Sequence, residues 1–258
     1  IIASDVSLAG AIASSGNLTL QPSTTGSGIG VGGGAGALNI SDAEILLLTD
    51  GFTTITIGDS TGGTGAVDID SSTFVDAITI VGGSIVVTGL TGDDTVDNGD
   101  GTGLQAVTLT ARTGNISDGE NAGATDVTGS LITLNAESGA IGEATGSGNE
   151  SLELAAVTLV TDSTDGANNG AQFLAESDIL TWNSSSAGTG TITITFGTFN
   201  VATGETITAS SVVADSGTLA GSGTVTGSVT ANSGGAVAPG FSPGILNTGN
   251  FTFGDNST

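Results

Sequence analysis

The sequence contains no cysteine, no histidine and no tyrosine. Without cysteine, no disulfide framework indicates the compartment in which the protein works. Without histidine and tyrosine, the chain lacks side chains that commonly serve as general acids and bases. Trp182 is the single tryptophan, so aromatic platforms for sugar rings are scarce as well. These absences favour a protein that is not an enzyme.

Positive charge is almost absent. One basic side chain, Arg112, stands against 26 Asp and Glu residues, and the formal net charge is −25. Nucleic acids and anionic membrane surfaces are bound by clustered Lys and Arg, so neither partner is expected. No apolar run is long enough for a membrane-spanning helix, so no membrane insertion is expected. The carboxylates suit metal cations, cationic surfaces or uncharged glycans as partners, or they keep a β-rich chain soluble.

Glycine is abundant, at 45 of 258 residues. Together with many Thr, Ser, Asn and Asp residues, this composition predicts short strands separated by turns. Within the strands, apolar residues alternate with threonine. In residues 191–196, for example, Ile192, Ile194 and Phe196 are predicted to face a core and the threonines to face solvent. No helical pattern lies between the strands, which argues against a βαβ design.

Two near-copies organise the chain. Residues 107–118 read VTLTARTGNISD, and residues 132–143 read ITLNAESGAIGE. At a constant offset of 25 residues, Leu109 matches Leu134, and an acidic residue ends both copies. A strand, a glycine turn, an apolar anchor and an acidic exit that recur at this period are typical of a solenoid of stacked coils.

We therefore predict an all-β fold, a right-handed parallel β-helix of roughly ten to twelve coils and about 50 Å in length. It would form one elongated domain over residues 1–258. An N-terminal module (1–58), main coils (59–210) and thin coils (211–258) would follow one another, as a segment of a larger chain. The predicted core residues are Leu109, Leu134, Ile116, Ile141, Leu152, Leu154, Val157, Leu159, Ile192 and Ile194.

One short helix is predicted near residues 41–50, flanking or plugging the core. Ser41 and Glu44 have the spacing of a capping box, and Gly51 follows where a C-terminal cap belongs. The glycine-rich stretch 27–36 is predicted to be a loop or a tight corner. No lysine follows this stretch, so it does not match a phosphate-binding loop. A further strand is predicted over residues 5–8.

Two acidic segments are candidate calcium sites, with calcium as the possible cofactor. The denser one, TGDDTVDNGDG, contains Asp93, Asp94, Asp97 and Asp100, and crowded carboxylates in a glycine-containing loop suit calcium. Its spacing does not match an EF-hand loop. Asp162 and Asp165 form a weaker version of the same pattern. The alternative for both segments is a solvated acidic turn.

Threonine-rich strands raise the possibility of an ice-binding face. Such a face would need threonine in register on many coils. At the position of Thr110, the second near-copy has Asn135, which interrupts that row. Strand propensity on an exposed face accounts for the threonines equally well.

Three segments resemble known families. Residues 107–182, with ARTGNISDGENAGATDVTG, LNAESGAIGEATGSGN and SLELAAVTL, resemble repeats of filamentous-haemagglutinin-like bacterial surface proteins. Residues 18–58 resemble another module of those proteins. Residues 217–246, with GTLAGSGTVTGSVTANSGGAVAPGFSPG, resemble the passenger-associated strand repeat of autotransporters. The resemblance implies a right-handed parallel β-helix that projects an adhesive or structural rod from a bacterial cell, with no catalytic residues in the motifs.

Three functional hypotheses follow. The first is a secreted or cell-surface, non-catalytic adhesin or structural rod that contacts glycans or neighbouring cell-surface proteins. The second is a self-assembling extracellular fibre, sheath or matrix subunit with calcium-bridged contacts, because stacked coils leave open sheet edges at both ends. The third is a polysaccharide-degrading β-helix enzyme, since paired carboxylates can cleave glycosidic bonds.

Overall fold

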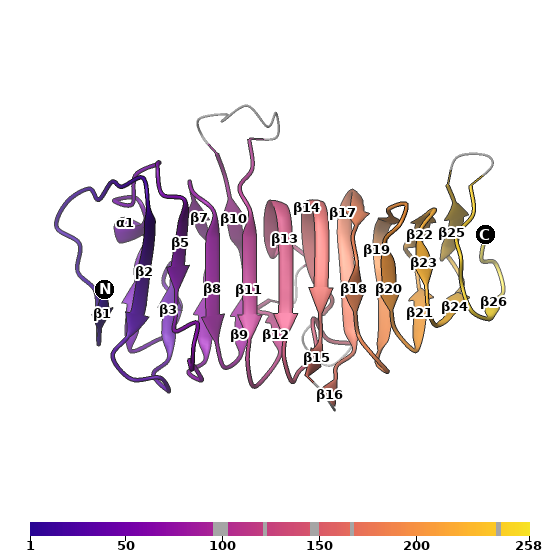
Figure 1. Cartoon of the computed structure of the whole chain (residues 1–258), viewed down its shortest axis with the longest axis horizontal. Helices are drawn as coiled ribbons and strands as arrows, with labels where there is room; N and C mark the ends of the chain where they lie inside the picture. The colour runs from indigo at the N-terminus through magenta and orange to yellow at the C-terminus, as the bar shows by residue number, and fades with distance from the viewer. Residues whose placement is uncertain (95–102, 121–122, 145–149, 166–167, 241–243) are drawn as a thin grey trace.

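A computed structural model describes residues 1–94, 103–120, 123–144, 150–165, 168–240 and 244–258. The chain is elongated, and its termini lie towards opposite ends (Figure 1). The described residues are nearly all in strands and turns, with one four-residue helix. The all-β prediction is confirmed. No described helix is long and apolar enough to cross a membrane.

The elements in the first half of the chain are β1 (Ile2–Ala3), β2 (Asn17–Pro22), β3 (Ile29–Val31), β4 (Leu38–Ile40), α1 (Asp42–Ile45), β5 (Thr54–Ile57), β6 (Val67–Ile69), β7 (Ser72–Phe74), β8 (Ile78–Gly82), β9 (Ile85–Val87), β10 (Leu90–Gly92), β11 (Val107–Ala111), β12 (Ile116–Asp118) and β13 (Val127–Ala136). The second half contains β14 (Leu152–Asp162), β15 (Thr164–Asp165), β16 (Asn168–Asn169), β17 (Gln172–Trp182), β18 (Ser185–Ser186), β19 (Thr191–Val201), β20 (Thr206–Thr208), β21 (Ser211–Ala214), β22 (Thr218–Gly221), β23 (Thr224–Val225), β24 (Ser228–Ala231), β25 (Ala236–Pro239) and β26 (Phe251–Phe253).

These strands form a 19-stranded sheet, a five-stranded sheet in the order β12-β9-β6-β3-β4, and the two-stranded pair β15-β16. The strands of the two larger sheets pair in parallel. Parallel pairing requires the chain to travel around and return between partners. The long strands β13, β14 and β19 each pair with two different strands on one side. The equally long β17 pairs with one long strand on each side, β14 and β19.

The near-copies pair in the register that the sequence predicts. Leu109 lies beside Leu134 in the β11–β13 ladder, and Ile116 forms a parallel bridge with Ile141. The solvent side of this ladder carries an unbroken threonine row that the sequence analysis missed. Its members, on five successive strands, are Thr19, Thr56, Thr79, Thr108 and Thr133. Val160 takes the next position and ends the row.

The core runs along the inside of these sheets. Nine of the ten predicted core residues are at most 1% exposed. Val157 is the exception at 46% exposed, so that prediction is wrong. The register of β14 against β17 shifts between Leu154 and Thr158, and this irregularity breaks the in–out alternation. Phe196 was predicted to face the core and is 61% exposed, beside a similar register shift in β19.

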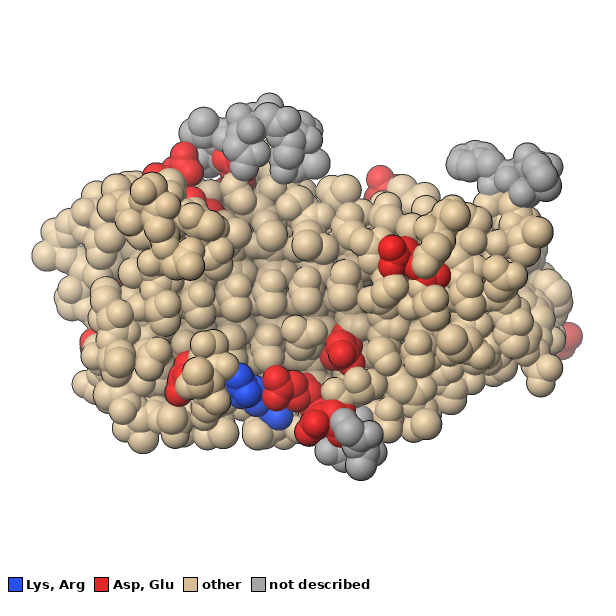
Figure 2. Space-filling model, viewed as in Figure 1, with Lys and Arg blue, Asp and Glu red and all other residues tan. Residues whose placement is uncertain are grey.

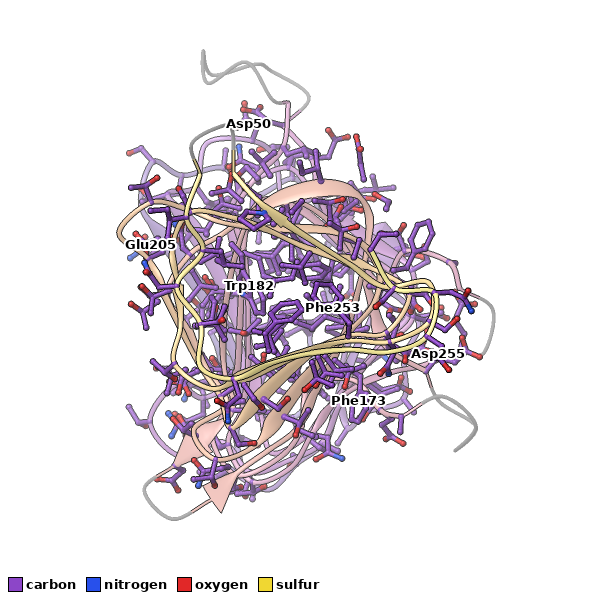
Figure 3. The ribbon with its side chains drawn as sticks, turned by 90° about the vertical axis from the view of Figure 1, so that its right-hand side faces the viewer. Asp50, Phe173, Trp182, Glu205, Phe253 and Asp255 are labelled. Carbon is purple, nitrogen blue, oxygen red and sulfur yellow. The ribbon has the colours of Figure 1, made fainter. Side chains whose placement is uncertain are left out.

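Trp182 is fully buried in the core. Its ring meets Phe199 edge to face at 5.3 Å between centroids, and its indole N–H donates to the Ser185 hydroxyl at 2.9 Å. Figure 3 shows Trp182 inside the ring of strands, whereas Glu205 and Asp255 lie on the outside.

The N-terminal predictions need three corrections. The helix is confirmed with its capping box, since the Ser41 N–H donates to Glu44 Oε2 at 3.0 Å, but it covers only Asp42–Ile45. The stretch 27–36 is not a plain loop, because it contains the buried strand β3. Its glycines permit tight packing: a Cβ on Gly30 would lie 2.0 Å from the Gly34 carbonyl oxygen. Residues 5–8 form no strand.

Candidate functional site

The predicted acidic loop is described only in part. Asp97 and Asp100 lie outside the described residues. The Asp93 N–H donates to the Phe74 carbonyl at 2.9 Å, which ties the loop to β7. Asp94 is 7% exposed, and its charge acts on the buried Asp76. Burial, with the charges of Asp50 and Asp94, raises the pKa of Asp76 above its ordinary value. Calcium in this loop stays a prediction.

Asp162 and Asp165 fit the alternative of a solvated turn. Asp162 Oδ1 accepts hydrogen bonds from the N–H of Thr164 at 3.0 Å and from its hydroxyl at 2.6 Å. Such an Asx turn uses the carboxylate to fix local backbone. Asp165 is exposed in the short pair β15–β16. Neither residue joins a three-carboxylate group among the described residues.

A different group of acidic side chains lies close together. Asp118, Asp126 and Glu153 each place one carboxylate oxygen within 4.8 Å of the other two. Asp118 ends β12, and Asp126 directly precedes β13. Glu153 belongs to β14 and lies beside Asp126, because Val127 pairs with Leu154 in the β13–β14 ladder. We call Asp118, Asp126 and Glu153 the acidic triad.

Two members of the triad are deeply buried, with Asp118 at 1% and Asp126 at 0% exposure. Asp118 Oδ1 accepts the Glu120 N–H at 2.7 Å, and Asp126 Oδ2 accepts the Glu153 N–H at 2.8 Å. The other oxygens, Asp118 Oδ2 and Asp126 Oδ1, are buried without a hydrogen-bond partner. An unpartnered buried polar atom is costly, and an uncompensated buried charge is more so.

No basic side chain balances the triad. Arg112 is the only one in the sequence, and it pairs with Glu137 at 3.7 Å and hydrogen-bonds the Ser60 carbonyl (blue in Figure 2). Burial raises the pKa of Asp126 well above its ordinary range, and the hydrogen bond of its protonated carboxyl group to Glu153 and the charges of Asp118 and Glu153 add to the rise. Burial raises the pKa of Glu153 in the same direction. The triad therefore favours a bound cation or proton.

The sequence analysis did not find the triad. It singled out Asp118 as the acidic exit of the first near-copy. Asp126 and Glu153 are 27 residues apart, against 25 for the near-copies, so the repeat offset does not align them. The signal available was that each acid lies within a short apolar strand or directly before one.

Two shallow hollows adjoin the places where strand register shifts. The first is lined by Leu104, Ala155, Ala156, Val157, Glu176, Ser177, Asp178, Ile179, Leu180, Thr181 and Asn200. Ile179, at 59% exposure, and Val157 give it apolar surface. The second is lined by Gly123, Thr125, Glu153, Leu154, Ala175, Glu176, Ser177 and Phe196, so Glu153 connects the triad to solvent.

Comparison with known proteins identifies no relative. No family model matches the chain, and no curated protein or solved structure matches it.

Proposed function

We propose that the chain is a right-handed parallel β-helix that works as a non-catalytic adhesive or structural rod, secreted or displayed on a bacterial surface. The observation that carries this proposal is the succession of parallel strands along the whole length of the molecule (Figure 1). A stack of coils in which each contacts its neighbours makes an extended structure with long side surfaces.

The side surfaces suit uncharged partners. Most of the face in Figure 2 is built from residues without charge, and the carboxylates are scattered over it. The threonine row adds hydroxyl and methyl groups at the spacing of the strands. Repeated shallow contacts of this kind match glycans or neighbouring cell-surface proteins.

The first hollow is the proposed contact site for a glycan. Val157 and Ile179 supply apolar surface for the face of a sugar ring. Asp178, Thr181 and Asn200 supply donors and acceptors for hydroxyls along its border. A few convergent polar groups around an apolar patch are the usual composition of a small-molecule site.

A glycan array probed with the labelled full chain tests this function. Ile179→Asp places a charge in the hollow, and Leu131→Asp places one on an exposed strand position outside it, at 39% exposure. We expect the wild type and Leu131→Asp to bind the same glycans and Ile179→Asp to lose at least tenfold in affinity. Equal binding by all three proteins would reject the hollow as the contact site. Failure of the wild type to bind any glycan or bacterial surface would remove the adhesive role.

A fibre subunit is the second candidate, and the exposed ends of the stack favour it. At the C-terminal end, β26 pairs only with β24 among the described strands, and Phe253 is 64% exposed. Figure 3 shows Phe253 near the middle of that end. At the N-terminal end, β1 pairs only with β2 among those strands, and Ile2 is 68% exposed. Open strand edges with apolar side chains can pair with another copy.

The polysaccharide-degrading hypothesis has less support. Glycoside cleavage needs two carboxyl groups that face the same bond. In the triad, Asp118 and Asp126 are buried, and Glu153 is the member that lines a hollow. Incubation with a polysaccharide panel, with reducing ends measured, should show no product. Product formation that Glu153→Gln abolishes would restore the enzyme hypothesis.

A further inference from the structure

We propose that Asp118, Asp126 and Glu153 bind one calcium ion between two adjacent coils. The first argument is electrostatic. Two of the carboxylates are buried, each with an oxygen that no hydrogen bond satisfies. A buried anionic group persists when a cation, a metal or a proton compensates it. The sole basic side chain, Arg112, is paired with Glu137.

The second argument concerns which cation fits. The donors are all carboxylate oxygens, which are hard ligands that suit calcium, magnesium or manganese and do not select zinc or copper. Three oxygens within 4.8 Å of one another can surround one ion at close to the calcium–oxygen distance of about 2.3–2.6 Å. Calcium accepts irregular geometry, whereas magnesium demands a near-ideal octahedron at about 2.0–2.1 Å. An irregular cluster drawn from three strand ends therefore favours calcium.

The third argument concerns access. Glu153 is half-buried and lines the second hollow together with Gly123 and Thr125. An ion can enter from this side, and water can fill the coordination positions that the protein leaves open. Asp118 and Asp126 remain on the buried side, and each has one oxygen without a hydrogen-bond partner that is free to bind an ion.

The site would fasten neighbouring coils together. Asp118 and Asp126 come from one coil, and Glu153 comes from the next. The two coils are already joined here by a hydrogen bond, which the Asp126 N–H donates to the Glu153 carbonyl at 2.9 Å. An ion bound to the folded chain and not to the unfolded chain stabilises the fold by mass action. At a calcium concentration a hundredfold above Kd, we expect the Tm to rise by roughly 5–10 °C.

The test uses the full chain after chelator treatment, titrated with calcium chloride and, separately, magnesium chloride by calorimetry, with a thermal melt at each concentration. We expect Asp126→Asn and Glu153→Gln to lose one bound calcium per chain or to weaken it at least tenfold. Asp162→Asn is the matched control, because it neutralises a carboxylate that serves a local turn, and it should bind like the wild type.

The proposal fails if folded wild type shows no calcium-dependent rise in Tm, or if the triad variants bind calcium as the wild type does. A more stable Asp126→Asn together with no calcium binding would show that protons alone compensate the triad. If Asp126→Asn does not fold, which circular dichroism would reveal, the half-buried Glu153→Gln decides the test. The result is independent of glycan binding, so either proposal can fail alone.

Discussion

At the scale of single residues, a side chain contributes to folding stability according to whether it points from its strand into the core or into solvent. Leu159 and Val157 are two positions apart in β14 and, by strict alternation, would face the same side. Leu159 is fully buried and Val157 is 46% exposed. The register shift at the corner separates them, so two similar apolar residues have different roles.

Alanine substitutions should reveal this difference. Leu159→Ala removes buried methyl groups and leaves a cavity, and we expect a loss of about 2–5 kcal/mol in the free energy of unfolding. Val157→Ala should change it by less than about 0.5 kcal/mol. Urea titration of both variants measures the two values. Similar losses in the two variants would contradict the corner geometry.

Glu176 is a buried acid whose protonation should couple to stability. It is 2% exposed, and its carboxylate accepts the Ala156 N–H at 3.2 Å and the Ser177 hydroxyl at 3.3 Å. Burial raises its pKa above the ordinary value of 4.5. The folded chain therefore holds this proton more tightly than the unfolded chain, and Glu176 makes stability fall as pH rises from 4.5 through the raised pKa.

Glu176→Gln should remove this contribution. We expect the stability of the variant, relative to wild type, to increase as pH rises across that window. Glu205→Gln is the opposite control, because hydrogen bonds from the Ser184 hydroxyl and N–H lower the pKa of Glu205. The contribution of Glu205 to folding stability is therefore present at pH values above its ordinary pKa of 4.5 and is lost as the pH falls through the lowered pKa. Urea titrations across pH measure both, and a Glu176→Gln difference that does not vary with pH would refute the assignment.

At the scale of elements, the segments between strands also pack directly against one another, backbone to backbone. A column of four glycines brings backbone segments that are far apart in the sequence against one another: Gly114, Gly139, Gly170 and Gly190. A Cβ on Gly139 would lie 2.2 Å from the Gly114 carbonyl oxygen, and one on Gly170 would lie 1.8 Å from the Gly139 oxygen. These contacts leave no room for a side chain.

Gly139→Ala should therefore force the backbone segments at Gly114 and Gly139 apart. We expect a destabilisation of about 1–3 kcal/mol, the usual cost of overpacking. Gly10→Ala is the matched control, because a Cβ there would have no heavy atom within 4 Å. Thermal unfolding of the two variants gives the comparison. A Gly139→Ala protein as stable as Gly10→Ala would show that the turns are not in contact.

Several strands could be placed from the alternation pattern alone. The bounds of β5 and β20 coincide with runs of alternating Ile and Thr, and those of β6 with the apolar–polar–apolar triplet Val67–Ile69. By itself the alternation indicates two separate strands, over residues 152–154 and 157–161, but β14 runs through both. At a bend, a strand keeps its backbone hydrogen bonds, but its side chains no longer alternate between core and solvent. The sequence pattern is therefore interrupted at residues 155–158, although the strand itself continues.

At the scale of the whole molecule, the two ends of the stack differ from its sides. Each end has a strand with one described partner strand and exposed apolar side chains, including Phe253 at the C-terminal end. Phe196 is exposed to a similar degree, 61% against 64%, but lies on the side of the molecule. Comparing Phe253 with Phe196 therefore separates association through the ends from nonspecific hydrophobic association through the sides.

If the ends join copies into fibres, sedimentation velocity at rising protein concentration should show the wild type associating. Phe253→Asp should shift the association to at least tenfold higher concentration, because a charge at the end opposes apolar contact. Phe196→Asp should associate like the wild type. A wild-type protein that stays monomeric at all concentrations would contradict the fibre hypothesis. If both variants lost association to the same extent, the contact between copies would not lie at the C-terminal end.

The sequence by itself determined the all-β class, the register of the near-copies and most of the core, because period-two alternation and a fixed offset are local properties of the chain. The tertiary structure decided the corners and the candidate metal site. Asp118, Asp126 and Glu153 come together because loops of unequal length bring three strand ends to one corner. No repeat in the sequence encodes that meeting, since it depends on the number of residues between paired strands, which is 25 in the β11–β13 ladder and 27 in the β13–β14 ladder.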